Sequence, residues 1–329
     1  MNRRLFLQSA SIAAAWPVLC HAQKPDRIPV VGFLRAEAGL SESRPLTVQL
    51  EFYREALREI GYIDGKTIRF EQPVVAAGPD GFDVAAKQLV RSNVALIFAG
   101  GTLAALAARN ASRTIPIWAY LADPVGTGLV SSLARPGGNI TGVATLAEET
   151  SAKRIELLKE ISPRATRFGV LANPDNPATA RQLEIMQSAA KSLGVKLQIL
   201  EIRRPGDLES MLSMSSNRAI EGLVTISDPI LSANPKLLKQ HALNKKIASI
   251  TAFREYAEAG GLISYGPDYR DLLRRCAIYT DKILRGAKPS ELQVEQPTKF
   301  DLVVNLKTAK ALGIKIPESI MLRATEVIR

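Results

Sequence analysis

The chain contains little cysteine and little histidine. Its 329 residues include two of each, and removal of an export signal ending at Ala22 would leave one of each, Cys276 and His241. A single cysteine forms no internal disulfide, and one cysteine with one histidine does not make a structural zinc site. Cys276 lies in an apolar stripe at helical spacing, which predicts core packing. We therefore expect no metal, no redox chemistry and no cofactor.

Signatures of catalysis and of nucleic-acid binding are also missing. There is no G-x-S-x-G nucleophile elbow, no P-loop and no G-x-G-x-x-G after the first predicted strand. The formal net charge is +11, but the basic residues are dispersed, without a basic run or interleaved aromatic residues. We therefore expect neither an enzyme nor a nucleic-acid partner, and an α/β transferase is the enzymatic alternative.

The first 22 residues have the layout of a secretory signal peptide. Arg3 and Arg4 are followed by an apolar stretch that runs to Leu19 and is too short to span a membrane. Cys20 and Ala22 are small residues at the positions that a signal peptidase reads. The sequence therefore predicts a signal peptide at 1–22 and a periplasmic protein. The paired arginines also suit twin-arginine export, and lipidation of Cys20 is the alternative that the bulky Leu19 disfavours.

Strand-like and helix-like segments alternate along the rest of the chain. Residues 28–34, 94–99 and 115–121 are near-continuous apolar runs, which is typical of parallel strands covered on both faces. A second alternating series begins near Ser151, after the turn-rich segment 135–139. Each series has the size of one doubly wound lobe, so the pattern predicts an α/β protein with two such lobes.

Candidate ligand-binding residues follow the predicted strands, because ligands of open parallel sheets bind beyond the carboxyl ends of the strands. Gly101 and Thr102 open a helix, where backbone N–H groups and the positive helix end suit a carboxylate. Asp123 and Asp228 each precede a proline after a strand. They either pair with a ligand ammonium or only begin a turn.

The second lobe offers further polar and aromatic candidates. Asn173 and Asn176 supply amides after the strand predicted at 167–172, and Tyr265 either stacks on a ligand or fills the core. A carboxylate site, an ammonium site and an aromatic wall together describe an α-amino acid, preferably an aromatic one. An aromatic acid without an amine is the alternative, with the aspartates only capping turns.

Several motifs in the same order carry a family resemblance that extends from about Val30 to Arg329. They are Gly100-Gly101-Thr102-Leu103, Asp123-Pro124-Val125-Gly126, Arg135-Pro136-Gly137-Gly138-Asn139, Leu171-Ala172-Asn173-Pro174-Asp175-Asn176-Pro177, Gly260-Gly261-Leu262-Ile263-Ser264-Tyr265-Gly266-Pro267 and Glu295-Gln296-Pro297-Thr298. Together they resemble the ABC-transporter substrate-binding family typified by tryptophan- and tyrosine-type uptake receptors. The sequence departs from that family at 35–44 and 71–81, both of which flank the expected cleft.

The resemblance implies a type I periplasmic-binding-protein fold, in which two doubly wound parallel-sheet lobes are joined by three crossing strands. The crossings would fall near Thr145, Tyr265 and Gln293. The N-terminal lobe would comprise 28–145 and 266–292, and the C-terminal lobe 146–265 and 293–329. Thr145 would join the other candidates in lining the cleft.

The resemblance also implies partners. The protein would close on a small-molecule ligand by hinge motion and deliver it to an ABC permease of the inner membrane with its ATPase. We expect a monomer. A sensory receptor that docks on a membrane kinase or chemoreceptor is the alternative.

Overall fold

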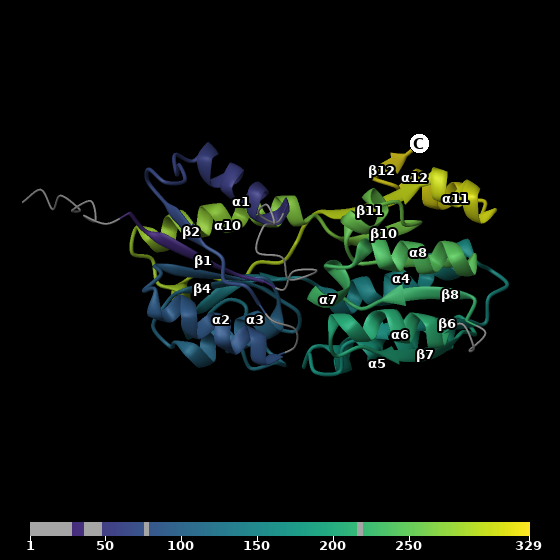
Figure 1. Ribbon diagram of the computed structural model, residues 1–329, viewed down its shortest axis with the longest axis horizontal. Coiled ribbons are helices and arrows are strands. Elements are labelled where there is room, and N and C mark those ends of the chain that lie inside the picture. Colours follow the sequence, from purple (N-terminus) through teal and green to yellow (C-terminus); the bar gives the residue numbers. More distant parts are fainter. Residues whose placement is uncertain (1–27, 36–47, 76–78, 216–219) are drawn as a thin grey trace, which may run out of the picture.

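The chain folds into two lobes, each built on one sheet (Figure 1). The computed structural model describes residues 28–35, 48–75, 79–215 and 220–329, so the predicted signal peptide and most of the 35–44 loop lie outside the described residues. None of the helices in these ranges is long and apolar enough to cross a membrane.

The first lobe contains a five-stranded parallel sheet in the order β2-β1-β3-β4-β5. Its strands are β1 (Val30–Leu34), β2 (Arg69–Glu71), β3 (Leu96–Ala99), β4 (Ile117–Leu121) and β5 (Ile140–Ala144). Helices α1 (Val48–Glu59) and α10 (Tyr269–Leu284) cover one face, and α2 (Pro79–Arg91) and α3 (Thr102–Ala111) cover the other (Figure 1). Both faces are covered, which explains why the strands are apolar without alternation.

Aromatic side chains fill the face of this sheet below α1 and α10. Phe33 stacks on Phe98 with ring centroids 4.4 Å apart, and Phe98 stacks on Trp118 at 5.5 Å. Cys276 is buried in the same cluster, as its helical spacing predicted. Most of the described aromatic residues thus lie in one core, which anchors α10 to the first lobe although α10 follows most of the second lobe in sequence.

The second lobe contains a seven-stranded sheet in the order β12-β11-β10-β9-β8-β6-β7. Its strands are β6 (Arg167–Ala172), β7 (Lys196–Glu201), β8 (Gly222–Thr225), β9 (Ala248–Thr251), β10 (Ile263–Pro267), β11 (Phe300–Asn305) and β12 (Glu326–Ile328). The sheet is parallel, as predicted, apart from one pair of strands, because β11 runs antiparallel to β10. The chain leaves this lobe after β10 and re-enters at the same end of the sheet, which forces β11 to run back.

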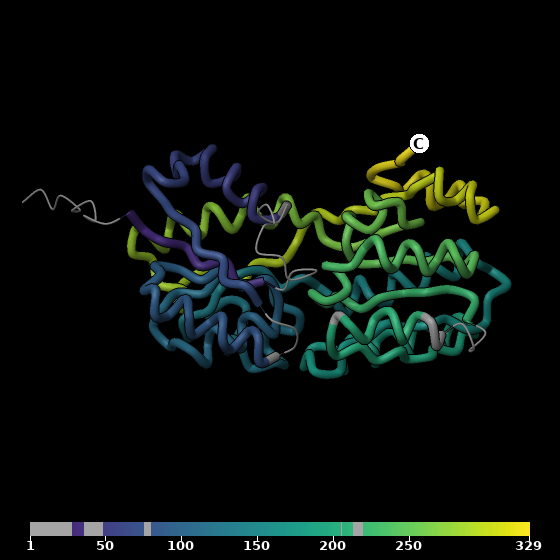
Figure 2. The backbone as a smooth tube through the Cα atoms, in the orientation of Figure 1, coloured from purple at the N-terminus to yellow at the C-terminus, as the bar shows by residue number. Residues whose placement is uncertain are grey.

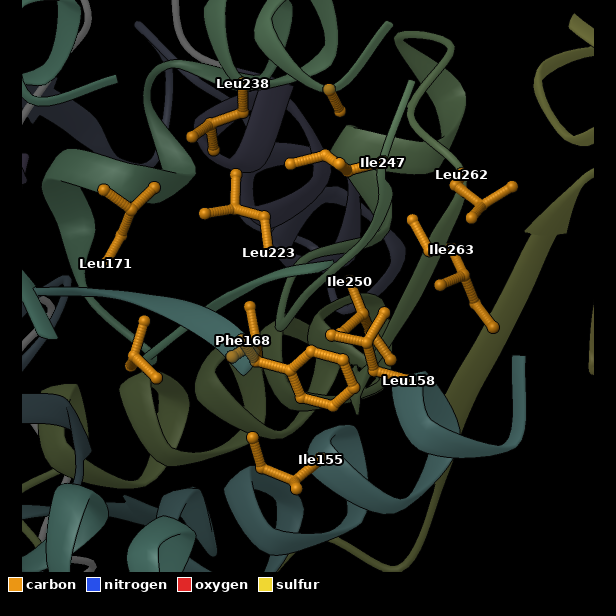
Figure 3. Packing of buried hydrophobic residues seen from close by; sticks show 14 of the residues in the cluster. Ile155, Leu158, Phe168, Leu171, Leu223, Leu238, Ile247, Ile250, Leu262 and Ile263 are labelled. Carbon is orange, nitrogen blue, oxygen red and sulfur yellow. The ribbon is translucent and has the colours of Figure 1, made fainter. Parts of the chain in front are cut away.

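Helices pack against the second sheet and complete its core. They are α4 (Ala147–Ile161), α5 (Thr179–Ser192), α6 (Pro205–Ser215), α7 (Pro229–Ser232), α8 (Pro235–Lys245), α9 (Arg254–Glu258), α11 (Leu306–Leu312) and α12 (Glu318–Arg323). A 3-10 turn, Pro289–Glu291, follows α10. Figure 3 shows Phe168 of β6 beside Leu158 and Ile155 of α4, with branched side chains of β8, β9 and β10 around them. This core is mainly aliphatic, in contrast to the aromatic-rich core of the first lobe.

Three segments connect the lobes, and Figure 2 follows the backbone through them. The first lies between β5 and α4, at Thr145 and Leu146, and the second lies between β10 and α10. Tyr265 is not itself a crossing residue, because it pairs with Leu302 inside the second sheet. The third connection begins after Glu295, whose backbone N donates to Gly142 O at 2.9 Å on the first sheet. It therefore starts later than the expected position at Gln293.

Candidate ligand-binding site

A cavity of about 40 Å³ lies between the lobes, where the carboxyl ends of the strands of both sheets meet. The lobes touch around it. Arg35 Nη2 of the first lobe donates to Ser232 Oγ of the second at 3.1 Å. A Cβ atom added to Gly101 would lie 3.1 Å from Pro229 Cγ across the gap. The structure is therefore in a closed arrangement, in which residues of both lobes can contact one ligand.

The start of α3 forms one wall of the cavity. Gly101 is the N-cap of α3 and has φ of 138° and ψ of 174°, a conformation that is essentially restricted to glycine. It brings the first N–H groups of a ten-residue helix to the cavity without a side chain in the way. Thr102 Oγ1 donates to Ala122 O at 3.4 Å, which ties the helix start to the end of β4. Free N–H groups and the helix dipole favour an anion here.

Arg35 adds a full positive charge beside this helix start. It follows β1 directly, is 8% exposed and lines the cavity. Its side chain passes over Gly100, where an added Cβ would lie 2.9 Å from Arg35 Cγ, so glycine is needed for the arginine to reach the cavity. No carboxylate among the described residues forms an ion pair with it. The sequence reasoning missed this residue, although a charged side chain directly after a buried strand was a visible signal.

Aromatic rings form a second wall. Tyr120, Phe253 and Tyr269 line the cavity, with ring centroids 5.1 Å apart between Tyr120 and Tyr269 and 5.4 Å apart between Phe253 and Tyr269. The pKa values of the Tyr120 and Tyr269 hydroxyls are raised, mainly because both groups are buried. Both phenols therefore stay protonated and available as donors at neutral pH. Sequence reasoning assigned the aromatic wall to Tyr265 instead.

Asp228 is buried at the cavity wall and is held by its own lobe. Its Oδ2 accepts from Asn173 Nδ2 at 3.2 Å and from Asn176 Nδ2 at 3.0 Å, and its Oδ1 accepts from the backbone N of Ile230 at 2.9 Å. Burial raises the pKa of the Asp228 carboxyl, and the three hydrogen bonds oppose that shift. Asp228 caps α7, and these bonds occupy three of the roughly four acceptor positions of a carboxylate.

The structure brings most, but not all, of the predicted residues together. Gly101, Thr102, Thr145, Asn176 and Asp228 line the cavity, and Asn173 supports Asp228 from behind.

Asp123 and Tyr265 lie elsewhere. Asp123 has a positive φ of 45°, and its Oδ1 accepts from Gly126 N at 2.9 Å, so it closes its own turn beside a different groove. Tyr265 stacks on Phe300 in the second sheet, with centroids 6.2 Å apart.

A fully buried arginine stands behind the second-lobe wall. Arg154 donates to Tyr265 O at 3.2 Å, to Ser151 Oγ at 2.7 Å and to Ser227 Oγ at 3.4 Å. Burial lowers its pKa to about 10. Within the described ranges no carboxylate pairs with it. Because Ser227 lines the cavity and Tyr265 belongs to the strand that leads into the second connection, Arg154 links the cavity wall to the hinge region.

The described part of the chain holds no group of three or more His, Cys, Asp or Glu residues that would suit a metal ion. His241 is 8% exposed in α8, away from the residues that line the cavity.

Residues 46–328 match the family model described as ABC transporter substrate binding protein. The chain belongs to this family. The family is one of substrate-binding proteins, which typically bind small molecules outside the cytoplasm for an ABC permease. A curated relative, the tyrosine-binding protein of Clostridioides difficile, is 27% identical over 263 residues, which cover 79% of this chain and 75% of the relative.

Solved structures show the type I periplasmic-binding-protein fold. A conserved domain protein from Vibrio cholerae is 28% identical, with a TM-score of 0.81 over 92% of this substrate-binding protein and 100% of that chain. A Streptococcus pneumoniae ABC domain in complex with L-Trp is 24% identical, with a TM-score of 0.79 over 92% and 100% of the two chains. A ligand-free, open substrate-binding protein from Clostridium difficile is 26% identical but has a TM-score of 0.60, over 92% and 99% of the chains.

Proposed function

We propose that this substrate-binding protein captures a small carboxylate with an aromatic group, either an aromatic amino acid or an aromatic acid, between its two lobes. The observation that carries the proposal is the guanidinium of Arg35, which lies beside the start of α3 at the cavity with no ion-pair partner among the described residues. A buried cation next to unbonded helix N–H groups is a site for an anion, and a carboxylate matches the planar guanidinium fork.

The aromatic wall supports the second half of the proposal. Tyr120, Phe253 and Tyr269 offer ring faces and edges on which an aromatic side chain packs favourably. The relatives point the same way, since one is named as a tyrosine-binding protein and one was crystallised with L-Trp.

Binding requires the lobes to separate first. A cavity of about 40 Å³ has room for only a few water molecules, each of which needs roughly 10–15 Å³, and this is too little for an aromatic ligand. The ligand therefore enters an open form, and the lobes then close on it less tightly than they do in this structure. Arg35 and α3 hold it from the first lobe and Phe253 contacts it from the second, so the ligand stabilises the closed state by its differential affinity.

The proposal includes export and delivery. Residues 1–22 would direct the chain to the periplasm as a cleaved signal peptide, and the mature protein would act as a monomer that hands its ligand to a permease. An intact mass that begins at Gln23, measured on periplasmic protein, supports this, whereas a chain that starts at Met1 or carries lipid on Cys20 overturns it.

Removal of the guanidinium tests the capture site. Isothermal titration with L-tyrosine, L-tryptophan and their desamino acids should give binding to the wild type. Arg35→Met should weaken binding by a hundredfold or more, because losing one partner of a buried charge pair costs about 3–5 kcal/mol and each 1.4 kcal/mol is tenfold. Arg135→Met, at an exposed arginine of the same lobe, is the matched control. If none of the four compounds binds, or if Arg35→Met binds as the wild type does, the proposal fails.

A further inference from the structure

Arg154 is a buried cation that the stability of the fold does not explain. It lies on α4 beside Ile155, whose side chain packs in the core of the second lobe (Figure 3), and it is fully buried. Its described partners are neutral oxygen atoms, and its Nε has no hydrogen-bond partner within the described ranges. A buried charge without a counter-charge costs free energy of folding. The guanidinium is therefore expected to serve binding rather than packing.

The contacts of Arg154 converge on Ser227. Its Nη2 donates to Ser227 Oγ at 3.4 Å and to Ser151 Oγ at 2.7 Å. Ser151 Oγ donates in turn to Gln182 Oε1 at 3.2 Å, and the same amide oxygen accepts from the backbone N of Ser227 at 3.0 Å. Arg154 thus holds the side chain of Ser227 while Gln182 holds its backbone, and both of these supporting residues are fully buried.

The direction of these hydrogen bonds determines what Ser227 can offer to a ligand. A guanidinium only donates, so the Ser227 hydroxyl is the acceptor toward Arg154. The hydrogen of that hydroxyl has no acceptor in the part of the chain that the structure describes. Asp228, the next residue, is occupied by three other donors. Since Ser227 is partly exposed and lines the cavity, its hydroxyl remains free to donate to a group that enters there.

The same guanidinium fixes Ser227 relative to a strand that leads out of the lobe. Arg154 Nη1 donates to the backbone oxygen of Tyr265 in β10 at 3.2 Å, and β10 runs into the second connection. The guanidinium is planar and rigid, so bonds at both Nη1 and Nη2 define its orientation. The position of the Ser227 hydroxyl is therefore set against the sheet, rather than by its own loop alone.

We propose that Arg154 is a positioning residue, which holds the Ser227 hydroxyl as a hydrogen-bond donor for an oxygen atom of the ligand. The inference rests on the proposed capture of a carboxylate. Arg35 binds the ligand from the first lobe and Ser227 adds a donor from the second, so the ligand joins the two lobes through hydrogen bonds on both sides. Arg154 is not among the residues that line the cavity and acts only through Ser227. A binding group keeps its productive geometry when a buried neighbour fixes it in this way.

A double-mutant cycle measured by calorimetry tests this assignment. The ligand is whichever of L-tyrosine, L-tryptophan and their desamino acids binds the wild type most tightly. Arg154→Met and Ser227→Ala should each weaken binding about tenfold, because each change removes the hydrogen bond that Ser227 donates to the ligand. The double variant should bind within about threefold of either single variant, because both changes remove the same interaction.

Lys153→Met is the matched control on the same helix. It removes a partly exposed cation and its surface ion pair with Glu156, and affinity should change by less than about twofold. Arg154→Met should unfold in urea at the same concentration as the wild type or a higher one, because it removes an uncompensated buried charge. Unchanged or raised stability distinguishes weaker binding from partial unfolding.

A second variant keeps the test independent of folding at Arg154. If Arg154→Met does not fold, Arg154→Lys takes its place in the cycle. Its ammonium lacks the planar fork, so its effect should likewise merge with that of Ser227→Ala. Wild-type affinity in either single variant, or losses that multiply in the double variant, would refute the positioning role and leave the capture proposal standing. If none of the four compounds binds the wild type, the capture proposal fails and this inference is overturned with it.

Discussion

Gly101→Ala should lower both the stability and the ligand affinity of this protein, for two separable reasons. The first is local. Gly101 has φ of 138°, and a residue with a Cβ held there costs about 1–3 kcal/mol. This strain exists whether the lobes are open or closed, since it lies in the backbone at the start of α3. It should therefore appear as a lower free energy of unfolding in the absence of ligand.

The second reason exists only when the lobes are closed. The new Cβ would lie 3.1 Å from Pro229 Cγ, so one lobe must retreat by a few tenths of an ångström. That retreat also stretches the Arg35–Ser232 hydrogen bond, whose net worth is about 1 kcal/mol. With the contact strain added, closure should cost about 1–2 kcal/mol more, which corresponds to a loss of affinity of roughly fivefold to thirtyfold.

Urea unfolding without ligand measures the first effect, and calorimetry with L-tyrosine or L-tryptophan measures the second. Gly138→Ala is the control, because Gly138 has no neighbour within 4 Å of an added Cβ and should change neither quantity. Unchanged affinity in a folded Gly101→Ala protein would refute the reasoning about closure. Unchanged stability would refute the reasoning about backbone strain.

Two aspartates should behave differently although each follows a strand and precedes a proline. Burial raises the pKa of the Asp228 carboxyl in the folded state. The contribution of this carboxyl to the free energy of unfolding is therefore fully present below the ordinary aspartate pKa of about 4, and it is lost as the pH rises through the pKa of the folded state. Asp228→Asn should remove that pH dependence, and urea unfolding between pH 3 and pH 7 that shows the same slope in both proteins would contradict this. Asp123→Ala should leave amino-acid affinity unchanged. It should lower the free energy of unfolding by about 0.5–1.5 kcal/mol, because it removes the hydrogen bond that Gly126 N donates to the side chain. A large loss of affinity in calorimetry would show instead that Asp123 contacts the ligand.

Local patterns in the sequence were sufficient for most strands and helices. The apolar runs at 94–99 and 115–121 became β3 and β4, and the apolar stripe that contains Cys276 lies on α10. The strand β5 was missed, because Thr141 and Gly142 interrupt its apolar pattern. Gly142 is required there, since a Cβ would lie 2.0 Å from Ala119 O of β4. A contact between two strands imposed that glycine, and no local pattern shows such a contact.

Some features of the binding site likewise follow from local sequence, and others depend on the tertiary structure. The sequence by itself determined the two-lobed α/β organisation and the ligand-facing ends of the strands, because hydrophobic periodicity and strand direction are local properties. Only the tertiary structure decided that Arg35 meets Ser232 and that Gln49 meets Glu255, pairs that lie about 200 residues apart. Those encounters depend on how the three connections place one lobe against the other. Asp123 and Asp228 look alike in the sequence, but backbone geometry and lobe closure put one in a surface turn and the other at the cavity wall.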